Sequence, residues 1–237
     1  MRVLGLIPAR GGSKGIVRKN LRLLAGRPML GYTAEAASGA IASGALARVI
    51  LSTDDPEIAE AGRACGLEVP FMRPPSLARD ETPMLPVIQH AIGFIHGCGD
   101  VYDAVCLLQP TNPLRCASDI ERAVQLLDET GADSVISFVR VGDKHPARMK
   151  LVDDDGRVTN PPFAESFEGQ RRQDLPPLYL REGSIYLTRT SVLMEKDSLS
   201  GDDCRALMIP EERAINVDTS LDLILAEHLL SLRQKPS

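Results

Sequence analysis

The sequence predicts an α/β domain built around a doubly wound, mostly parallel sheet. Between Val3 and Val139, short apolar runs alternate with segments of helical periodicity, which is the pattern of consecutive βαβ units. The chain has 237 residues, of which 43% are hydrophobic and 25% charged, as in an ordinary globular protein. This length allows one large domain or two small ones, and we interpret residues 1–237 as a single domain.

Apolar runs and capping signals delimit the elements of the amino-terminal half. Asp55-Pro56-Glu57 supplies an N-cap, a proline in the first turn and an early acid, so a helix is expected from there to about Cys65. Ser118 and Glu121 form a capping box for a helix that ends near Gly131. The other predicted elements are strands at Val3–Ile7, Arg48–Ser52, Val69–Phe71, Ala104–Leu108 and Ser134–Val139, and helices at Met29–Ala42 and Pro83–His96.

Residues 140–182 interrupt this alternation. The segment is polar and rich in proline, and Lys150–Val158 has the pattern of a hairpin with an acidic turn. Two interpretations stay open, namely an inserted arm that contacts a partner subunit and a loose surface excursion. Strands are expected again at Ser184–Thr188 and Ala206–Ile209, followed by a helix over Leu221–Leu232.

The composition excludes several classes of protein. A net charge of −5 disfavours non-specific binding of nucleic acid. The five cysteines are scattered without a CxxC pair, which argues against a disulfide framework or a zinc site and is typical of a reducing cytoplasm. No apolar run approaches the roughly 20 residues of a membrane span, and the one before Pro8 is too short for a signal peptide. We therefore expect a cytoplasmic protein without nucleic-acid or membrane partners.

A glycine-rich, cationic loop follows the first strand. Glycines allow several backbone N–H groups to point at one site, and cations can surround that site with positive charge, as a bound polyphosphate requires. The spacing matches neither a P-loop nor a dinucleotide fingerprint. A solvated surface turn is the alternative, which the preceding strand and the density of cations disfavour. The loop contains the glycines Gly11, Gly12 and Gly15 and the cations Arg10, Lys14, Arg18 and Lys19.

Three more polar clusters are expected at the same edge of the sheet, because ligands bind beyond the carboxyl ends of parallel strands. They are Ser52–Asp55, Gln109–Arg115 and Asn216–Thr219. Asp218 could hold a Mg²⁺ ion that bridges phosphates, or it could cap the last helix. Gln109 could bond the backbone of its own loop or a substrate hydroxyl.

Together these segments resemble the N-acylneuraminate cytidylyltransferase family, the enzymes that activate sialic acids. The resemblance implies a Rossmann-like nucleotidyltransferase sheet with an inserted dimerisation arm. It also implies a homodimer that condenses CTP with a nine-carbon 2-keto sugar acid to give the CMP-sugar and pyrophosphate. The matching motifs span nearly the whole chain: Ile7–Gly15, Lys19-Asn20, Ser52–Asp54, Leu108–Arg115, Arg172–Pro176, Gly183–Tyr186 and Val217–Thr219.

The resemblance also implies a role for each matching residue. The catalytic residues would be Arg10, Lys14, Lys19 and Arg172. The nucleotide would be bound by Arg10, Gly12, Ser13, Lys14, Lys19, Asn20, Arg73 and Thr82. The acid substrate would be bound by Gln109, Arg148, Arg172 and Tyr186, and the cofactor Mg²⁺ by Asp218 and Asn216.

Three departures from the family pattern limit what the resemblance implies. Val17 stands where a proline is common, Glu182 where an asparagine is frequent, and Asn216 where many members have a second aspartate. The carboxylate of Glu182 leaves the acid open among sialate, legionaminate, pseudaminate and others, and the neutral Asn216 predicts metal dependence with weaker binding of the ion. The alternatives are a nucleotidyltransferase for another base or sugar, such as Kdo or a guanylyl transfer, and a nucleotide-binding homologue without turnover.

Overall fold

A six-stranded sheet forms the centre of the molecule, with strand order β10-β6-β9-β5-β1-β4. The computed structural model describes residues 1–13, 15–167 and 169–233, without the side chain of Arg172. The pairs β1·β4, β1·β5 and β10·β6 are parallel, whereas β9 lies antiparallel between β5 and β6. This confirms the mostly parallel α/β sheet. The strands are β1 (Val3–Pro8), β4 (Arg48–Ser52), β5 (Ala104–Leu107), β6 (Ser134–Arg140), β9 (Tyr179–Arg189) and β10 (Cys204–Met208).

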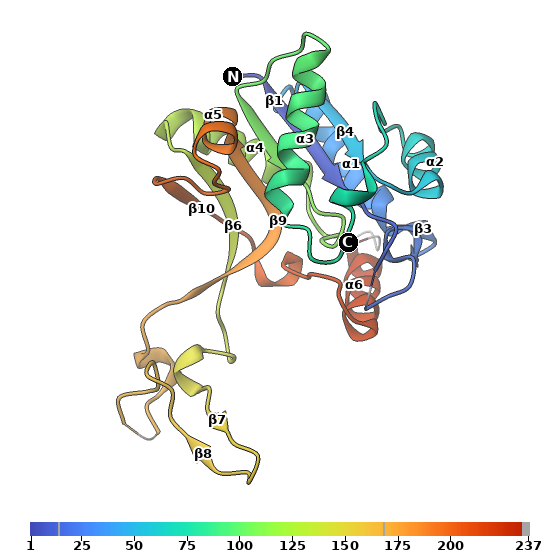
Figure 1. Cartoon of the computed structure of the whole chain (residues 1–237). Coiled ribbons are helices and arrows are strands. Elements are labelled where there is room, and N and C mark those ends of the chain that lie inside the picture. Colours follow the sequence, from blue (N-terminus) through green and yellow to red (C-terminus); the bar gives the residue numbers. More distant parts are fainter. Residues whose placement is uncertain (14, 168, 234–237) are drawn as a thin grey trace.

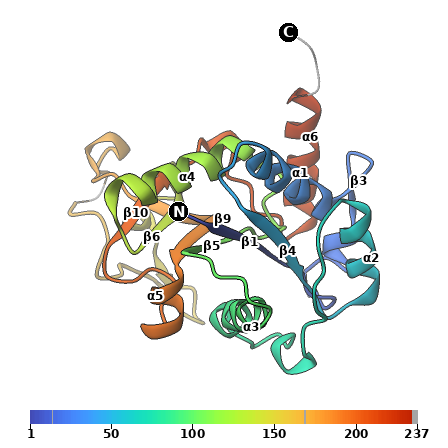
Figure 2. The ribbon, with the colours of Figure 1, turned by 90° about the horizontal axis from the view of Figure 1, so that it is seen from above.

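Helices cover both faces of the sheet (Figure 2). On one face, α1 (Met29–Ala42) and α4 (Ala117–Thr130) pack over a core that includes Ile7, Leu51 and Val135. On the other face, α3 (Met84–Gly97) and α5 (Thr190–Glu195) pack over Leu6 and Ile50. Residues one apart on a strand thus serve opposite layers, as the strand period requires.

The remaining elements lie beside the sheet. Helix α2 (Pro56–Ala64) flanks β4, and α6 (Ser220–Arg233) packs against the short hairpin of β2 (Leu23–Leu24) and β3 (Arg27–Pro28). The helix predicted at Leu221–Leu232 is confirmed. Within the part of the chain that the structure describes, no helix combines the length and apolarity needed to cross a bilayer.

Strands β6 and β9 continue past the sheet and carry a projecting arm (Figure 1). We define the arm as residues 141–178. It contains the hairpin of β7 (Leu151–Val152) and β8 (Val158–Thr159), which confirms the hairpin expected there. The excursion is shorter than the predicted 140–182, because the β6·β9 ladder continues to the pair Arg140–Tyr179.

Two local predictions were wrong. No strand forms at Val69–Phe71, because Pro70 cannot donate to a ladder, and only isolated bridges form on either side of it. Helix α4 begins at Ala117 with Cys116 as its cap and Asp119 as the third residue, instead of with the Ser118–Glu121 box. The carboxylate of Asp119 accepts the Cys116 N–H at 3.0 Å, so the capping box is formed by Cys116 and Asp119, each two residues before the predicted partner.

Candidate active site

A cleft of about 400 Å³ opens at the carboxyl ends of β1 and β5. Three segments that are distant in sequence line it: the loop Arg10–Asn20, the turn Gln109–Arg115 and the segment before α6. This is the sheet edge at which the polar clusters were expected to meet. The lining residues are Pro8, Arg10, Ser13, Gly15, Lys19, Asn20, Arg73, Met84, Gln109, Pro110, Thr111 and Asp218.

Hydrogen bonds hold the loop Arg10–Asn20, which we call the phosphate loop, in place. The backbone N–H of Gly11 donates to Oδ1 of Asp54 at 3.1 Å, which ties the loop to the end of β4. Buried Asn20 donates from Nδ2 to the carbonyl of Arg10 at 3.0 Å and closes the loop on itself. Asn20 therefore lines the cleft as expected and also shapes the loop.

Gly15 allows the phosphate loop to touch the segment before α6. A Cβ at this position would lie 2.3 Å from the carbonyl oxygen of Asp218, far inside van der Waals contact. The same two segments are joined by Lys19, whose Nζ lies 2.8 Å from Oδ1 of Asp218 and 3.0 Å from the carbonyl of Val217. The cleft wall on this side thus depends on a residue without a side chain.

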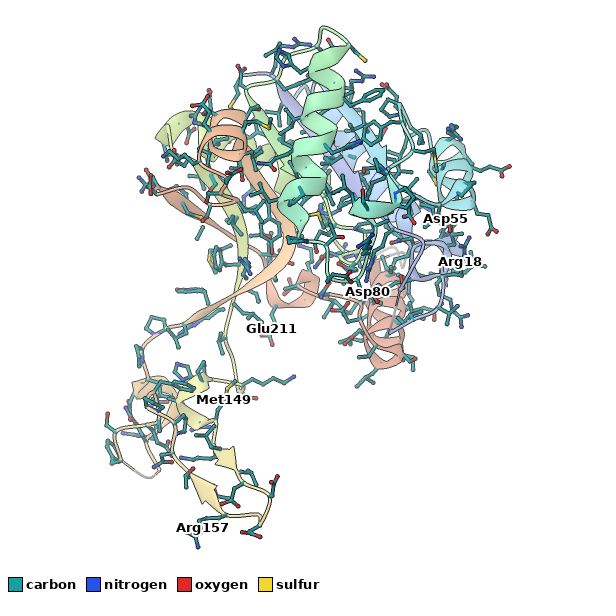
Figure 3. The ribbon with its side chains drawn as sticks, in the orientation of Figure 1. Arg18, Asp55, Asp80, Met149, Arg157 and Glu211 are labelled. Atoms are coloured by element: carbon teal, nitrogen blue, oxygen red, sulfur yellow. The ribbon has the colours of Figure 1, made fainter. Side chains whose placement is uncertain are left out.

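The cations of the phosphate loop do not all face the cleft. Arg10 lines it and pairs with Asp80 at 2.7 Å. Arg18, which we expected beside the polyphosphate, instead binds Asp55 and Glu57 of the α2 amino terminus (Figure 3). Arg18 therefore fastens the loop to α2, and the expectation that it would face the polyphosphate was wrong.

Arg73 adds a buried positive charge to the cleft. Only 5% of the residue is exposed, and its Nε donates to Oγ of Ser52 at 3.0 Å. Burial lowers the pKa of its guanidinium to about 10, so Arg73 still carries its charge at neutral pH. A fixed cation in a poorly solvated wall attracts an anionic ligand more strongly than a solvated lysine does.

Asp218 does not cap the last helix. The cap is formed by Thr219 and Asp222, since Oδ2 of Asp222 accepts the N–H groups of Thr219 at 2.8 Å and of Asp218 at 3.1 Å. The Asp218 carboxylate is 58% exposed and accepts from Lys19 and from the side-chain amide of Asn216. It is therefore available to a ligand in the cleft.

The metal-binding potential of these residues is limited to one carboxylate and one amide. Within residues 1–13, 15–167 and 169–233, no group of three or more His, Cys, Asp or Glu side chains gathers in a way that could hold a metal. Mg²⁺ is commonly held by one or two protein carboxylates together with substrate phosphates. Asp218 and Asn216 fit that shared mode and do not fit an all-protein cage.

The structure places five predicted residues outside the lining of the cleft, and one of them, Asn216, donates its side-chain amide to Asp218, which does line it. Gly12 is exposed, and a Cβ added there would meet no atom of the described residues within 4 Å apart from its chain neighbours, whereas Thr82 donates to the carbonyl of Ser76 at 3.3 Å. Arg148 lies in the arm and donates to the carbonyl of Gln170 at 3.3 Å. Tyr186 lies half-buried on β9 against the α3 side of the core. Lys14 and the side chain of Arg172 are outside the described residues.

Two residues without an assigned role organise the turn Gln109–Arg115. Asn112 is fully buried, and Arg115 is 6% exposed with hydrogen bonds to three different elements. Both stand in a motif that pointed to the site, but a sequence does not show which polar residues of a turn face inward. The turn also accepts the N–H of Val217 through the Thr111 carbonyl at 2.8 Å, which joins it to the Asp218 segment.

A cationic cleft at the carboxyl edge of a doubly wound sheet defines a protein that binds an anionic, nucleotide-like ligand. A family model described as cytidylyltransferase matches residues 4–201. The chain belongs to this family and is a nucleotidyltransferase enzyme. Its relatives and structural neighbours agree with that class.

Several relatives match over the whole chain. The CMP-N,N'-diacetyllegionaminic acid synthase of Legionella pneumophila is 32% identical, covering 99% of each chain. A pseudaminic acid cytidylyltransferase of Campylobacter jejuni is 30% identical with the same coverage. An N-acylneuraminate cytidylyltransferase of Streptococcus agalactiae is 33% identical over 94% of this chain and 52% of its own. The solved structure of a CMP:2-keto-3-deoxy-manno-octonic acid synthetase with CTP shares the fold, with a TM-score of 0.72, 20% identity and coverage of 98% and 100%.

Proposed function

We propose that this enzyme condenses CTP with a nonulosonic acid, a nine-carbon 2-keto sugar acid, to give the CMP-sugar and pyrophosphate. The observation that carries the proposal is the cleft, to which Arg10, Lys19 and Arg73 supply cations and Gln109 supplies an amide. Relatives at 30–33% identity are named for legionaminic, pseudaminic and N-acylneuraminic acids, which share this sugar class.

The proposed reaction needs positioning and charge stabilisation more than covalent chemistry. The anomeric hydroxyl of the acid would attack the α-phosphorus of CTP in line, and the bond to the pyrophosphate oxygen would break. Negative charge would grow on the departing pyrophosphate, and the cations Arg10 and Lys19, which line the cleft, would stabilise it. Asn20 and Arg73 would hold the nucleotide, and Gln109 would orient the acid.

We further propose that Mg²⁺ binds together with the triphosphate, held by Asp218 with the carbonyl oxygen of Asn216. The ion would neutralise phosphate charge. Lys19 now occupies one oxygen of the Asp218 carboxylate at 2.8 Å, and the other oxygen accepts the Asn216 amide. Binding through the amide carbonyl would require the Asn216 side chain to turn, and its neutral amide attracts the ion less than a second carboxylate would.

A pyrophosphate-release assay tests the reaction. CTP, GTP, ATP and UTP are each combined with sialic, legionaminic and pseudaminic acids and with Kdo. The proposal predicts release with CTP and at least one nonulosonic acid. Release only with GTP or only with Kdo would assign another base or sugar, and nucleotide binding without any release would indicate a homologue without turnover.

We also propose that the enzyme is a homodimer in which the arm of one copy reaches the cleft of the other. Large apolar side chains are exposed on and beside the arm, and clusters of this kind mark interaction surfaces. Arg148 lies on the arm and does not line the cleft of its own chain. The exposed apolar side chains are Met149, Leu151, Val152, Val158, Phe163, Phe167, Tyr179 and Leu180.

A complementation experiment tests the shared site. Lys19→Ala impairs the core and Arg172→Ala the arm, so each homodimer should have little turnover. If the arm acts across the dimer, mixing the two variants after partial unfolding restores one intact site per heterodimer, about a quarter of wild-type activity for random pairing. No recovery, with heterodimers shown by native mass spectrometry, would place the arm over its own cleft.

A further inference from the structure

Arg115 is the most extensively bonded buried cation next to the cleft. Its Nε donates to the carbonyl of Ser184 on β9 at 2.8 Å, and its Nη1 donates to the hydroxyl of Thr33 on α1 at 3.1 Å. Its Nη2 donates to the carbonyl of Gln109. One guanidinium thus joins a strand, a helix and the turn that delivers Gln109 to the cleft.

The charge of Arg115 is buried without a direct ion pair, as far as the described residues show. Burial lowers the pKa of its guanidinium to about 10, so it is charged at neutral pH. The nearby Glu182 carboxylate is itself buried and accepts from Asn112 Nδ2 at 3.1 Å and from the Ser184 N–H at 3.1 Å. Burying a guanidinium is costly unless its donors are satisfied, and here all three of its nitrogens donate to described acceptors.

The network fixes the Gln109 turn on two sides. Asn112 reaches β9 through the carbonyl of Glu182 at 3.2 Å, and Gly183 has a φ of +91° with its Cβ position 3.7 Å from Oε1 of Gln109. A side chain at Gly183 would be strained by this φ, and its Cβ would stand in ordinary van der Waals contact with the Gln109 amide. Gln109 therefore lies against β9, with its backbone held by Arg115 and its turn held by Asn112.

We propose that Arg115 is a positioning residue for the sugar-acid substrate, acting by holding the backbone of Gln109 so that its amide faces the cleft. The proposal rests on the proposed function, in which Gln109 contacts the acid. Lysine cannot replace this arginine, because a single ammonium cannot span three acceptors on three elements. Arg10 and Lys19, proposed for the nucleotide, lie on another loop, which receives none of the described hydrogen bonds of Arg115.

The test compares Arg115→Lys with Arg189→Lys. Arg189 is a matched control at the other end of β9, where its guanidinium donates to the carbonyls of Ala132 at 2.7 Å and Leu127 at 3.4 Å. Arg115→Lys should raise the KM for the sugar acid by about tenfold and the KM for CTP by less than about twofold. Arg189→Lys should lower the Tm and leave both KM values unchanged.

A double variant tests whether Arg115 acts through Gln109. In a Gln109→Ala background, Arg115→Lys should no longer change the KM for the acid, because the side chain that it orients is absent. Equal increases in both KM values for Arg115→Lys, or the same increase with and without Gln109, would overturn the proposal and leave Arg115 with a purely structural role.

Hydrogen exchange gives a measurement that does not depend on turnover. Arg115→Lys should speed amide exchange within residues 109–115, whereas Arg189→Lys should not; unchanged exchange there would also overturn the proposal. A wild-type enzyme that uses no nonulosonic acid would refute the proposed function alone. In that case the exchange data, and the KM for the sugar that it does use, still decide the role of Arg115.

Discussion

Replacement of Gly15 by alanine tests whether the phosphate loop must touch the Asp218 segment. The added Cβ would lie 2.3 Å from the carbonyl oxygen of Asp218, whereas ordinary contact begins at 3.4 Å. The two segments must therefore separate by about 1 Å, and a shift of that size in substrate-positioning groups costs roughly 100-fold in rate. The same separation would lengthen the 2.8 Å contact between Lys19 and Asp218.

The assay measures kcat/KM for pyrophosphate release alongside the Tm. Gly15→Ala should lower kcat/KM about 100-fold, while an overpacked loop contact costs only about 1–3 kcal/mol of stability, so the fold persists. Gly97→Ala is the control, because Gly97 lies at the exposed end of α3 with no atom within 4 Å of its Cβ position. A Gly15→Ala enzyme with kcat/KM within about threefold of wild type would refute the reasoning.

Four further predictions concern the cleft and its support. Gly12→Ala should raise the KM for CTP several-fold, as the nucleotide role that the family resemblance implies for Gly12 requires, and it should leave the Tm unchanged, because among the described residues no atom beyond its chain neighbours lies within 4 Å of the added Cβ. Asp218→Ala should lower turnover at limiting Mg²⁺ by at least about tenfold, and full turnover in a magnesium titration would contradict the metal assignment. Lys14→Ala should lower kcat far more than the Tm, since a loop lysine contributes little to folding; equal losses in both would make the loop a structural turn. Asp55→Ala should lower the free energy of unfolding by about 1 kcal/mol or more, because α2 loses its N-cap and Arg18 loses an ion-pair partner. Burial opposes ionisation of Asp55, but the α2 N–H groups and Arg18 outweigh it and lower the pKa of the carboxyl. The Tm of wild type should therefore exceed that of Asp55→Ala by its largest amount above the unfolded pKa of about 3.9. This difference should shrink as the pH falls through the lower pKa of the folded state.

The parts of the fold that follow from local chemistry were predicted from the sequence. Asp55 does accept N–H groups at the start of α2, and Gly131 does end α4 with a φ of +67°. The position of β9 could not be predicted, because pairing between β5 and β6 is a non-local choice that leaves no periodic signal. A cysteine cap for α4 was missed because Cys116 is not a usual capping residue.

The same distinction holds for the site. The phosphate loop was predicted to lie at the sheet edge because its glycines and cations follow the first strand directly. This local pattern is typical of a polyphosphate site and does not depend on the rest of the chain. Arg18 was misassigned because its partners, Asp55 and Glu57, come from α2 and compete for it in space. Arg115 was passed over because its burial depends on β9 and α1, which lie far from it in sequence.

The residues proposed to bind the two substrates lie in two parts of the molecule: the cleft, which holds the nucleotide residues and Gln109, and the arm, which holds Arg148. The cleft side is one bonded unit, in which the phosphate loop, the Gln109 turn and the Asp218 segment hold one another through Lys19 and Thr111. Arg148, proposed for the acid, lies on the arm, which β6 and β9 carry away from the sheet (Figure 1). If the arm supplies acid contacts across a dimer, then exchanging residues 141–178 with those of a relative should change which acid is used and leave the KM for CTP unchanged. A parallel change in the KM for CTP would mean that the arm also shapes the nucleotide side, and that the two specificities are not separable.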